Sequence, residues 1–142
     1  MNQFLKRAQE LMEELVADRR AIHSFGGTGF EVRETSDYIY KRLCTLGLKP
    51  ERICGTGIVC TIGKGEKTFL LRSDMDALPF AEETGLPYAC RNGSHHACGH
   101  DMHAAMLLGA ARMLSERELP GCVKLMFQPA EETLDGCKAM IA

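Results

Sequence analysis

Two short apolar runs with an amphipathic segment between them constrain the fold of this chain more than any other feature. Residues 67–72 and 122–127 are apolar runs bounded by turn residues, which is typical of buried strands. Residues 103–115 between them carry apolar side chains at helical spacing. This strand–helix–strand order predicts two parallel strands joined by a crossover, with both carboxyl ends at one edge of the sheet. We therefore expect an α/β fold with its functional side chains at that edge.

The rest of the chain predicts further helices and a hairpin around this unit. Residues 3–22 have the apolar stripe of one amphipathic helix, and residues 31–46 predict a second helix that ends before Gly47. Residues 49–62 predict a hairpin interrupted by glycines, and residues 137–142 begin another helix. The sequence contains no internal repeat, and its 142 residues suffice for one domain with a core.

Composition and charge limit the partners and the cellular location that are expected for this chain. The net charge of -2 gives no reason to expect nucleic acid or an anionic membrane as a partner. No apolar run approaches the ~18 residues of a membrane span, and the N-terminal residues have no signal-peptide pattern, so export is not expected. The seven cysteines are odd in number and scattered in spacing, which favours reduced thiols in the cytoplasm.

The segment from residue 95 to residue 103 has the side chains of a metal site. It holds four of the five histidines of the chain, together with Cys98 and Asp101. A thiolate, an imidazole and a carboxylate are good zinc ligands and also serve nickel or manganese. Cys98 and His100 flank a single glycine, which allows the tight turn that both need to face one ion. The other three histidines, His95, His96 and His103, stay outside the predicted ligand set.

Carboxylates follow both predicted strands and should complete this site. Asp74 and Asp76 come after the first strand, and the Glu131–Glu132 pair comes after the second. We expect one glutamate of the pair to bind metal and the other to activate a metal-bound water, whose pKa the ion lowers to about 7. Asp76 or Asp101 would orient a ligand. The three clusters together predict a metal site at the sheet edge.

Four ordered motifs resemble the N-terminal part of the hippurate hydrolase and indoleacetyl-amino-acid hydrolase family, metal-dependent amidohydrolases related to aminoacylases and carboxypeptidases. The motifs cover nearly the whole chain: Arg19-Arg20-Ala21-Ile22-His23, Arg72-Ser73-Asp74-Met75-Asp76-Ala77-Leu78-Pro79, His96-Ala97-Cys98-Gly99-His100-Asp101-Met102-His103 and Phe127-Gln128-Pro129-Ala130-Glu131-Glu132.

The resemblance implies a role for each matching residue. Cys98, His100 and Glu132 match metal ligands, and Cys98 is placed to bridge two ions of zinc, manganese or nickel. Glu131 matches the general base that takes a proton from the attacking water, and Asp76 matches the acidic residue that orients the site. The reaction implied is hydrolysis of the amide bond of an N-acyl amino acid, a small-molecule substrate.

The resemblance also implies an incomplete unit. The fold would be a three-layer αβα catalytic domain of the zinc-peptidase type with a mixed, largely parallel sheet. Residues 1–142 would form its N-terminal part. Family chains are more than twice as long, so we expect the lid or dimerisation domain, the C-terminal part of the catalytic domain and further histidine ligands to be absent. One local departure from the family pattern is the glycine-rich stretch after His23, where a Pro-Glu pair is usual.

Two other function classes remain open at the level of sequence. The chain could be a catalytically silent metal-binding fragment, or one half of a split enzyme that pairs with a complementing C-terminal chain or with itself, since an unfinished sheet exposes an edge. It could also be a cysteine hydrolase that uses Cys98 with His100 or His103. That last reading leaves the Glu131–Glu132 pair without a role and places the nucleophile and its base on one short loop.

Overall fold

The two apolar runs form neighbouring parallel strands of one four-stranded sheet in the computed structural model, which describes residues 2–142. The strand order is β1-β2-β4-β3, with β3 (Thr68–Asp74) parallel to β4 (Cys122–Gln128). β4 also pairs antiparallel with β2 (Gly57–Gly63), which pairs antiparallel with β1 (Glu51–Ile53). The predicted parallel pair, hairpin and mixed sheet are therefore confirmed. The expectation of a largely parallel sheet is wrong for these strands, because only β3 and β4 pair in parallel and the other two pairings are antiparallel.

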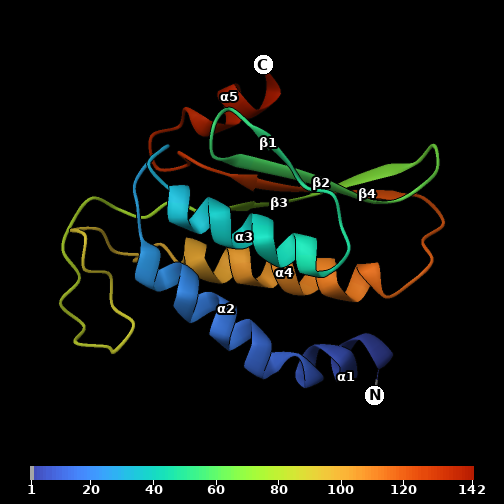
Figure 1. Cartoon of the computed structure of the whole chain (residues 1–142), viewed down its shortest axis with the longest axis horizontal. Helices are drawn as coiled ribbons and strands as arrows, with labels where there is room; N and C mark the ends of the chain where they lie inside the picture. The colour runs from blue at the N-terminus through green and yellow to red at the C-terminus, as the bar shows by residue number, and fades with distance from the viewer. Residues whose placement is uncertain (1) are drawn as a thin grey trace.

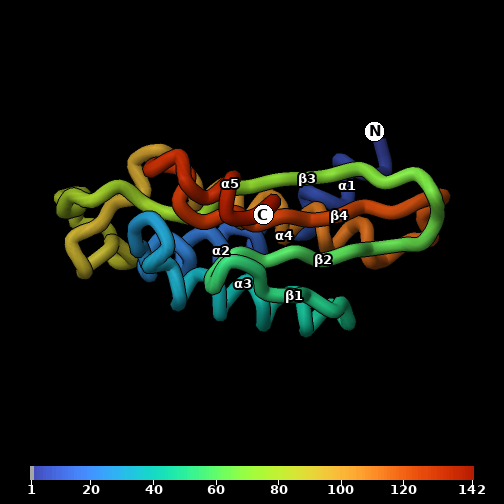
Figure 2. The backbone as a smooth tube through the Cα atoms, turned by 90° about the horizontal axis from the view of Figure 1, so that it is seen from above, coloured from blue at the N-terminus to red at the C-terminus, as the bar shows by residue number. Residues whose placement is uncertain are grey.

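Helices lie on both sides of the sheet, as Figure 1 shows. α3 (Arg33–Thr45) and α4 (His100–Ser115) cover one face, and α2 (Met12–Phe25) packs on α4 farther from the sheet. α5 (Gly136–Ile141) lies on the opposite side, above the strands in Figure 1 and in front of them in Figure 2. The αβα layering that the resemblance implied is present, with α5 as the described part of the second helical layer.

The single helix predicted over residues 3–22 is two helices. α1 (Gln3–Glu10) ends before Leu11, and α2 begins directly after it. Leu11 is buried, whereas α1 buries no residue of its own. α1 lies instead over the end of α4, where Arg7 pairs with Glu116 at 2.7 Å. The apolar stripe predicted helical conformation correctly but not this break, because the break depends on where α4 ends.

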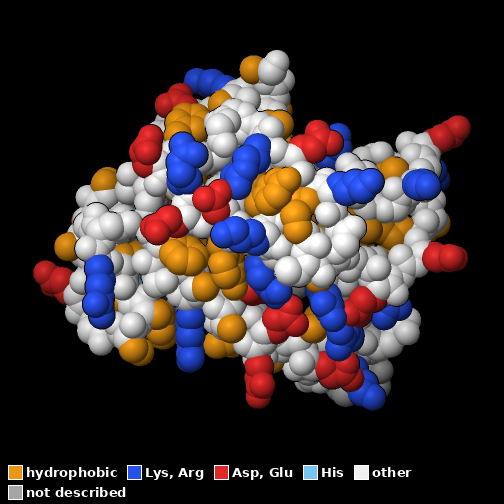
Figure 3. Space-filling model, viewed as in Figure 1, with side chains coloured by type: hydrophobic (Ala, Val, Ile, Leu, Met, Phe, Trp, Pro, Cys, Tyr) orange, Lys and Arg blue, Asp and Glu red, His pale blue; other side chains and the backbone are white. Residues whose placement is uncertain are grey.

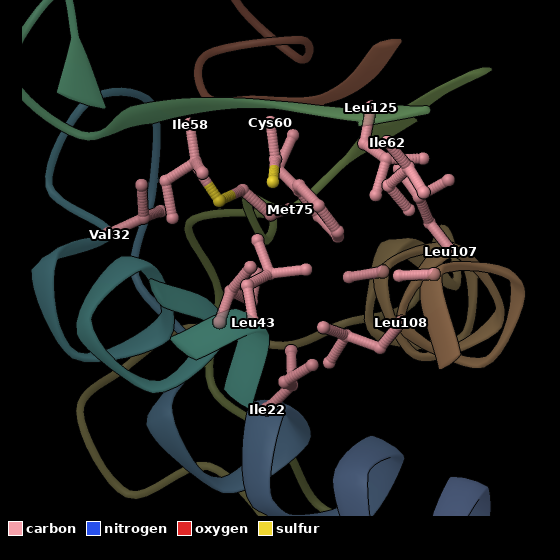
Figure 4. Packing of buried hydrophobic residues seen from close by; sticks show 14 residues of the cluster. Ile22, Val32, Leu43, Ile58, Cys60, Ile62, Met75, Leu107, Leu108 and Leu125 are labelled. Carbon is pink, nitrogen blue, oxygen red and sulfur yellow. The ribbon is translucent and has the colours of Figure 1, made fainter. Parts of the chain in front are cut away.

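The core lies between the sheet and α3 and α4, and Figure 4 shows its side chains in contact. α2 approaches α4 closely at Gly109, where an added Cβ would lie 2.6 Å from Leu15 Cδ2. A larger residue at this position would require the Leu15 side chain to move. The buried core residues come from α2, α3, α4, β2 and β4, with Val32 directly before α3 and Met75 directly after β3: Ile22, Val32, Ile39, Leu43, Ile58, Cys60, Ile62, Met75, Ala104, Leu107, Leu108, Ala111, Leu125 and Phe127.

The prediction that residues 67–72 form a buried strand is wrong in one respect. The strand forms, but Phe69 is 68% exposed and Leu70 is 54% exposed. β3 is an edge strand, because β4 lies between it and β2 in the sheet order. The outer edge of β3 therefore has no paired strand within the described residues.

Surface charge, the state of the cysteines and the apolarity of the helices complete the description of the fold. Acidic and basic side chains are interspersed on the face drawn in Figure 3 rather than gathered by sign. All seven cysteines are free thiols in the described part of the chain, as their spacing predicted. Between residues 2 and 142, no helix has both the length and the apolarity of a membrane span.

Candidate metal centre

The predicted polar clusters meet at one edge of the sheet. β3 ends at Asp74, which is in register with Gln128 at the end of β4, and α4 begins beside them at His100. The chain then continues from β4 through Pro129 and Ala130 into the Glu131–Glu132 pair. The parallel pairing of β3 and β4 thus brings segments nearly 60 residues apart to the same place, as expected from their order in the chain.

Three predicted ligands lie within reach of one ion. Ligand atoms of Cys98, His100 and Glu132 all lie within 4.8 Å of one another. His100 Nε2 is 3.6 Å from Glu132 Oε1 and 3.6 Å from an oxygen of Glu131. Gly99 makes the turn possible, because its φ of 84° lies in the left-handed region that favours glycine. The backbone therefore presents the thiol and the imidazole to one point, as the Cys-Gly-His spacing predicted.

His100 is oriented by its other ring nitrogen. Nδ1 lies 3.0 Å from the backbone carbonyl oxygen of Asp76, to which an N–H there donates. This leaves the lone pair of Nε2 directed at the carboxylates, an arrangement common for metal-binding histidines. Burial lowers the pKa of His100, but the hydrogen bond to Asp76 and the charges of Asp74 and Glu132 outweigh it and raise the pKa.

Asp76 holds the glutamate pair in place. Its side chain is buried, and its two oxygens accept the backbone N–H groups of Glu131 at 3.1 Å and Glu132 at 3.2 Å. Burial raises the pKa of Asp76, but hydrogen bonds from His100 and from these two amides outweigh it, and the pKa is lowered. The carboxylate is thus kept charged and fixes the position of the backbone that carries both glutamates.

The surroundings of Glu132 and Cys98 are acidic and favour the binding of a cation. Glu132 Oε1 is buried without a hydrogen-bond partner, which is costly for a carboxylate oxygen unless a positive charge lies nearby. The carboxylate of Glu132 raises the pKa of the Cys98 thiol, with smaller contributions from burial and from the charge of Glu131. Nucleophilic cysteines are found instead in electropositive surroundings, so these acidic neighbours argue against the cysteine-hydrolase reading.

A second set of possible ligands shares His100. Asp74 and His103 lie close enough to His100 to form another group of three. Nε2 of His100 has one lone pair and can serve only one ion. Asp74 is also bonded outside this group, since Arg72 Nη1 lies 2.8 Å from one of its oxygens, and its other oxygen lies 2.7 Å from His103 Nδ1, a hydrogen-bond length. The set of Cys98, His100 and Glu132 therefore has the freer donor atoms.

The sequence did not reveal a buried polar network behind this site. His23 Nδ1 lies 2.7 Å from an oxygen of Asp101, and its Nε2 lies 2.9 Å from an oxygen of Glu82. His96 is buried nearby, and burial lowers its pKa to about 4 despite the opposing charge of Asp101. The motif from Arg19 to His23 was the only signal of this network, and nothing in its spacing identified the partners.

Glu82 makes part of the stability of this network dependent on pH. Burial raises the pKa of Glu82, but hydrogen bonds from Thr84, the Cys90 amide and His23 outweigh it and lower the pKa to about 2. A lowered pKa stabilises the folded state above the ordinary pKa near 4.5, and this contribution is lost as pH falls from there towards 2.

Glu82→Gln should therefore flatten the acid side of the stability profile. We expect the wild-type midpoint of thermal unfolding to fall more between pH 6 and pH 3 than that of the variant, as measured by circular dichroism. Glu118→Gln, at an exposed glutamate, is the matched control and should keep the wild-type slope. A slope in Glu82→Gln as steep as in the wild type would contradict the assignment.

Comparisons with known proteins agree with this arrangement. Residues 70–142 match the model of peptidase family M20/M25/M40. The chain is 44% identical over 139 residues to the IAA-amino acid hydrolase ILR1-like 2 of Arabidopsis thaliana, covering 94% of this chain and 32% of that protein. It is 42% identical over 136 residues to the hippurate hydrolase of Campylobacter jejuni, covering 93% of this chain and 36% of that one.

The fold agrees with a solved structure as well. The YXEP protein of Bacillus subtilis, described as a dinuclear metal binding peptidase from the M20 family, superposes with a TM-score of 0.87 at 34% identity. The match covers 94% of this chain and 39% of that one. The chain thus spans about a third of the length of the two hydrolases and two fifths of that peptidase. Since the family model matches half of its residues, the chain belongs to peptidase family M20/M25/M40.

Proposed function

We propose that residues 1–142 form the N-terminal part of the catalytic domain of a metal-dependent amidohydrolase. The lid or dimerisation domain and the C-terminal part of the catalytic domain would lie outside these residues. The coverage of about a third of each named hydrolase supports this division. The names of those relatives support an N-acyl amino acid as the substrate, and the free thiols support a cytoplasmic location.

One observation carries the proposal: donor atoms of Cys98, His100 and Glu132 converge while Glu132 Oε1 is buried without a partner. These donors fit a divalent cation of borderline softness, of which zinc, manganese and nickel are the candidates. The dinuclear relative supports two ions in the complete site, of which Cys98, His100 and Glu132 would hold part. Further ligands would come from parts of the enzyme beyond these residues.

The residues around this site would have separate roles in amide hydrolysis. A divalent ion bound there would polarise the substrate carbonyl and lower the pKa of its water. Glu131, whose side chain is 34% exposed, would take the proton from that water and return it to the leaving nitrogen. Asp76 holds the backbone of Glu131 and Glu132 through the two amide hydrogen bonds. Asp76 would therefore keep the base and the ligand at a constant separation.

The exposed apolar strand supports a complementing polypeptide as the partner of this chain. Phe69, Leu70 and Leu71 lie exposed in succession on β3, at an edge where another strand can pair. A C-terminal chain that supplies the rest of the sheet would cover them, and pairing of two copies is the other candidate. In either case the chain alone would bind metal with an incomplete ligand set and hydrolyse substrate poorly or not at all.

The test is hydrolysis of hippurate and of N-acetyl amino acids with zinc, manganese or nickel, by this chain and by a longer enzyme that contains it. We expect the longer enzyme to be active, to lose activity with a chelator and to regain it with metal. Binding of metal by the 142-residue chain alone is measured in parallel. Activity that survives complete metal removal but not thiol alkylation would instead favour Cys98 as a nucleophile.

A further inference from the structure

His23 lies between two carboxylates that come from different segments of the chain. It is in the last turn of α2, with Asp101 Oδ2 at 2.7 Å from Nδ1 and Glu82 Oε2 at 2.9 Å from Nε2. The side chains of all three residues are almost completely buried, with exposed fractions of 3%, 0% and 0%. Both distances are hydrogen-bond lengths, so the imidazole ring is held between the two carboxylates.

These contacts tie both flanks of the Cys98–His100 segment to α2. Asp101 directly follows His100 in the first turn of α4. Glu82 belongs to the long loop that precedes Cys98, and it also accepts the backbone N–H of Cys90 at 2.7 Å. Displacement of the imidazole would therefore remove one contact from the loop and one from the helix start, where Arg19 Nε also lies 2.6 Å from the same oxygen of Asp101.

The distances show a hydrogen-bonded brace rather than a second ion site. Glu82 and His95 could join His23 as a group of three ligands. Ligand atoms around a tetrahedral zinc ion lie about 3.3 Å apart, given bonds of roughly 2.0–2.1 Å. Within this group, His23 Nε2 lies 2.9 Å from Glu82 Oε2, which is shorter and matches a hydrogen bond, whereas His100 Nε2 lies 3.6 Å from the nearest carboxylate oxygens.

We propose that His23 is a positioning residue for the metal-binding segment and acts through Asp101 and Glu82. This inference rests on the proposed metal site at Cys98, His100 and Glu132. His23 touches none of these ligands through its ring nitrogens; it holds the backbone on which two of them stand. Residues outside the ligand set that fix ligand orientation typically change metal affinity by about 10–100-fold.

The test is a titration of the full chain with Co²⁺, read by the near-ultraviolet charge-transfer band of cobalt thiolate and the visible bands. His23→Gln removes the ring whose two nitrogens contact Asp101 and Glu82. We expect about tenfold weaker Co²⁺ binding or more, with an altered spectrum. Glu82→Gln removes the charge of the carboxylate that contacts His23 Nε2. Where His23→Gln fails to fold, Glu82→Gln replaces it, and we expect the same weakening of Co²⁺ binding and the same change in the spectrum.

Asp18→Asn is the matched control on the same helix. Asp18 is buried and accepts hydrogen bonds from Tyr38 at 2.6 Å and Arg42 at 2.7 Å, so it joins α2 to α3 rather than to the metal-binding segment. The Asp18→Asn variant should lower the midpoint of thermal unfolding, as His23→Gln does, and should leave the Co²⁺ affinity and the spectrum unchanged. A purely structural role for His23 would make the two variants behave alike, which would overturn the inference.

Two further variants separate the possible failures. If Cys98→Ala leaves Co²⁺ binding unchanged, the proposed metal site itself is wrong, and this inference falls with it. If Cys98→Ala weakens binding while His23→Gln has wild-type affinity and spectrum, the positioning role alone is overturned. Loss of one bound Co²⁺ per chain in His95→Ala would show an ion between His23, Glu82 and His95, which also contradicts the brace.

Discussion

A full-length enzyme that carries Glu131→Gln should keep its metal and lose its turnover by about 10²–10⁴-fold, the usual contribution of a general base. Glutamine has nearly the shape of glutamate and keeps the backbone N–H that Asp76 accepts at 3.1 Å, so the local structure should persist. It cannot take a proton from water at neutral pH. The measurements are kcat for hydrolysis of an N-acyl amino acid and metal content by atomic emission.

Glu118→Gln is the control for this variant, since Glu118 is an exposed glutamate in the turn after α4. It should have wild-type turnover and metal content. Near-normal turnover in Glu131→Gln would show that another group is the base. Loss of turnover together with metal would instead make Glu131 a ligand, which its 3.6 Å distance from His100 Nε2 permits.

Cys98→Ala should weaken binding of a divalent metal to the 142-residue chain by at least about tenfold, because it removes a thiolate from the ligand set. Glu132→Gln should act in the same direction, since it removes the charge of a carboxylate whose Oε1 has no hydrogen-bond partner. Isothermal titration with Zn²⁺ measures both. The cobalt–thiolate absorption band should disappear in Cys98→Ala and remain in Glu132→Gln.

Cys44→Ala is the control for the thiol, because Cys44 is a free, exposed cysteine on α3. The Cys44→Ala variant should bind metal with the affinity of the wild type. Wild-type affinity in both Cys98→Ala and Cys44→Ala would remove Cys98 from the ligand set. A reduction of the same size in both would point to general destabilisation or to non-specific binding by exposed thiols.

Much of the site could be predicted because its parts are local in sequence. The turn at Gly99 brings Cys98 and His100 together over three residues, and this needs no knowledge of the rest of the fold. The Glu131–Glu132 pair could be placed beside them because parallel strands joined by a helix end at one edge. Asp76 was expected to orient the site, but its two hydrogen bonds to the glutamate amides became visible only in the structure.

The contacts that could not be predicted span long separations in the chain. His23 and Asp101 are 78 residues apart, and His23 and Glu82 are 59 apart. Charged and imidazole side chains at such distances have many possible partners, and their pairing depends on how α2 and the loop before Cys98 pack. The break at Leu11 has the same origin, since it follows from the position of α1 over α4.

The sequence by itself determined the strand–helix–strand unit, the ligand turn and the carboxylates that join it, because periodicity and chain order act over short distances. Only the tertiary structure decided which strand lies at the edge of the sheet. An apolar run predicts a strand but not its neighbours, and β4 pairs with both β2 and β3, which leaves Phe69 and Leu70 exposed. Only the tertiary structure, likewise, placed His23 between two buried carboxylates behind the metal-binding turn.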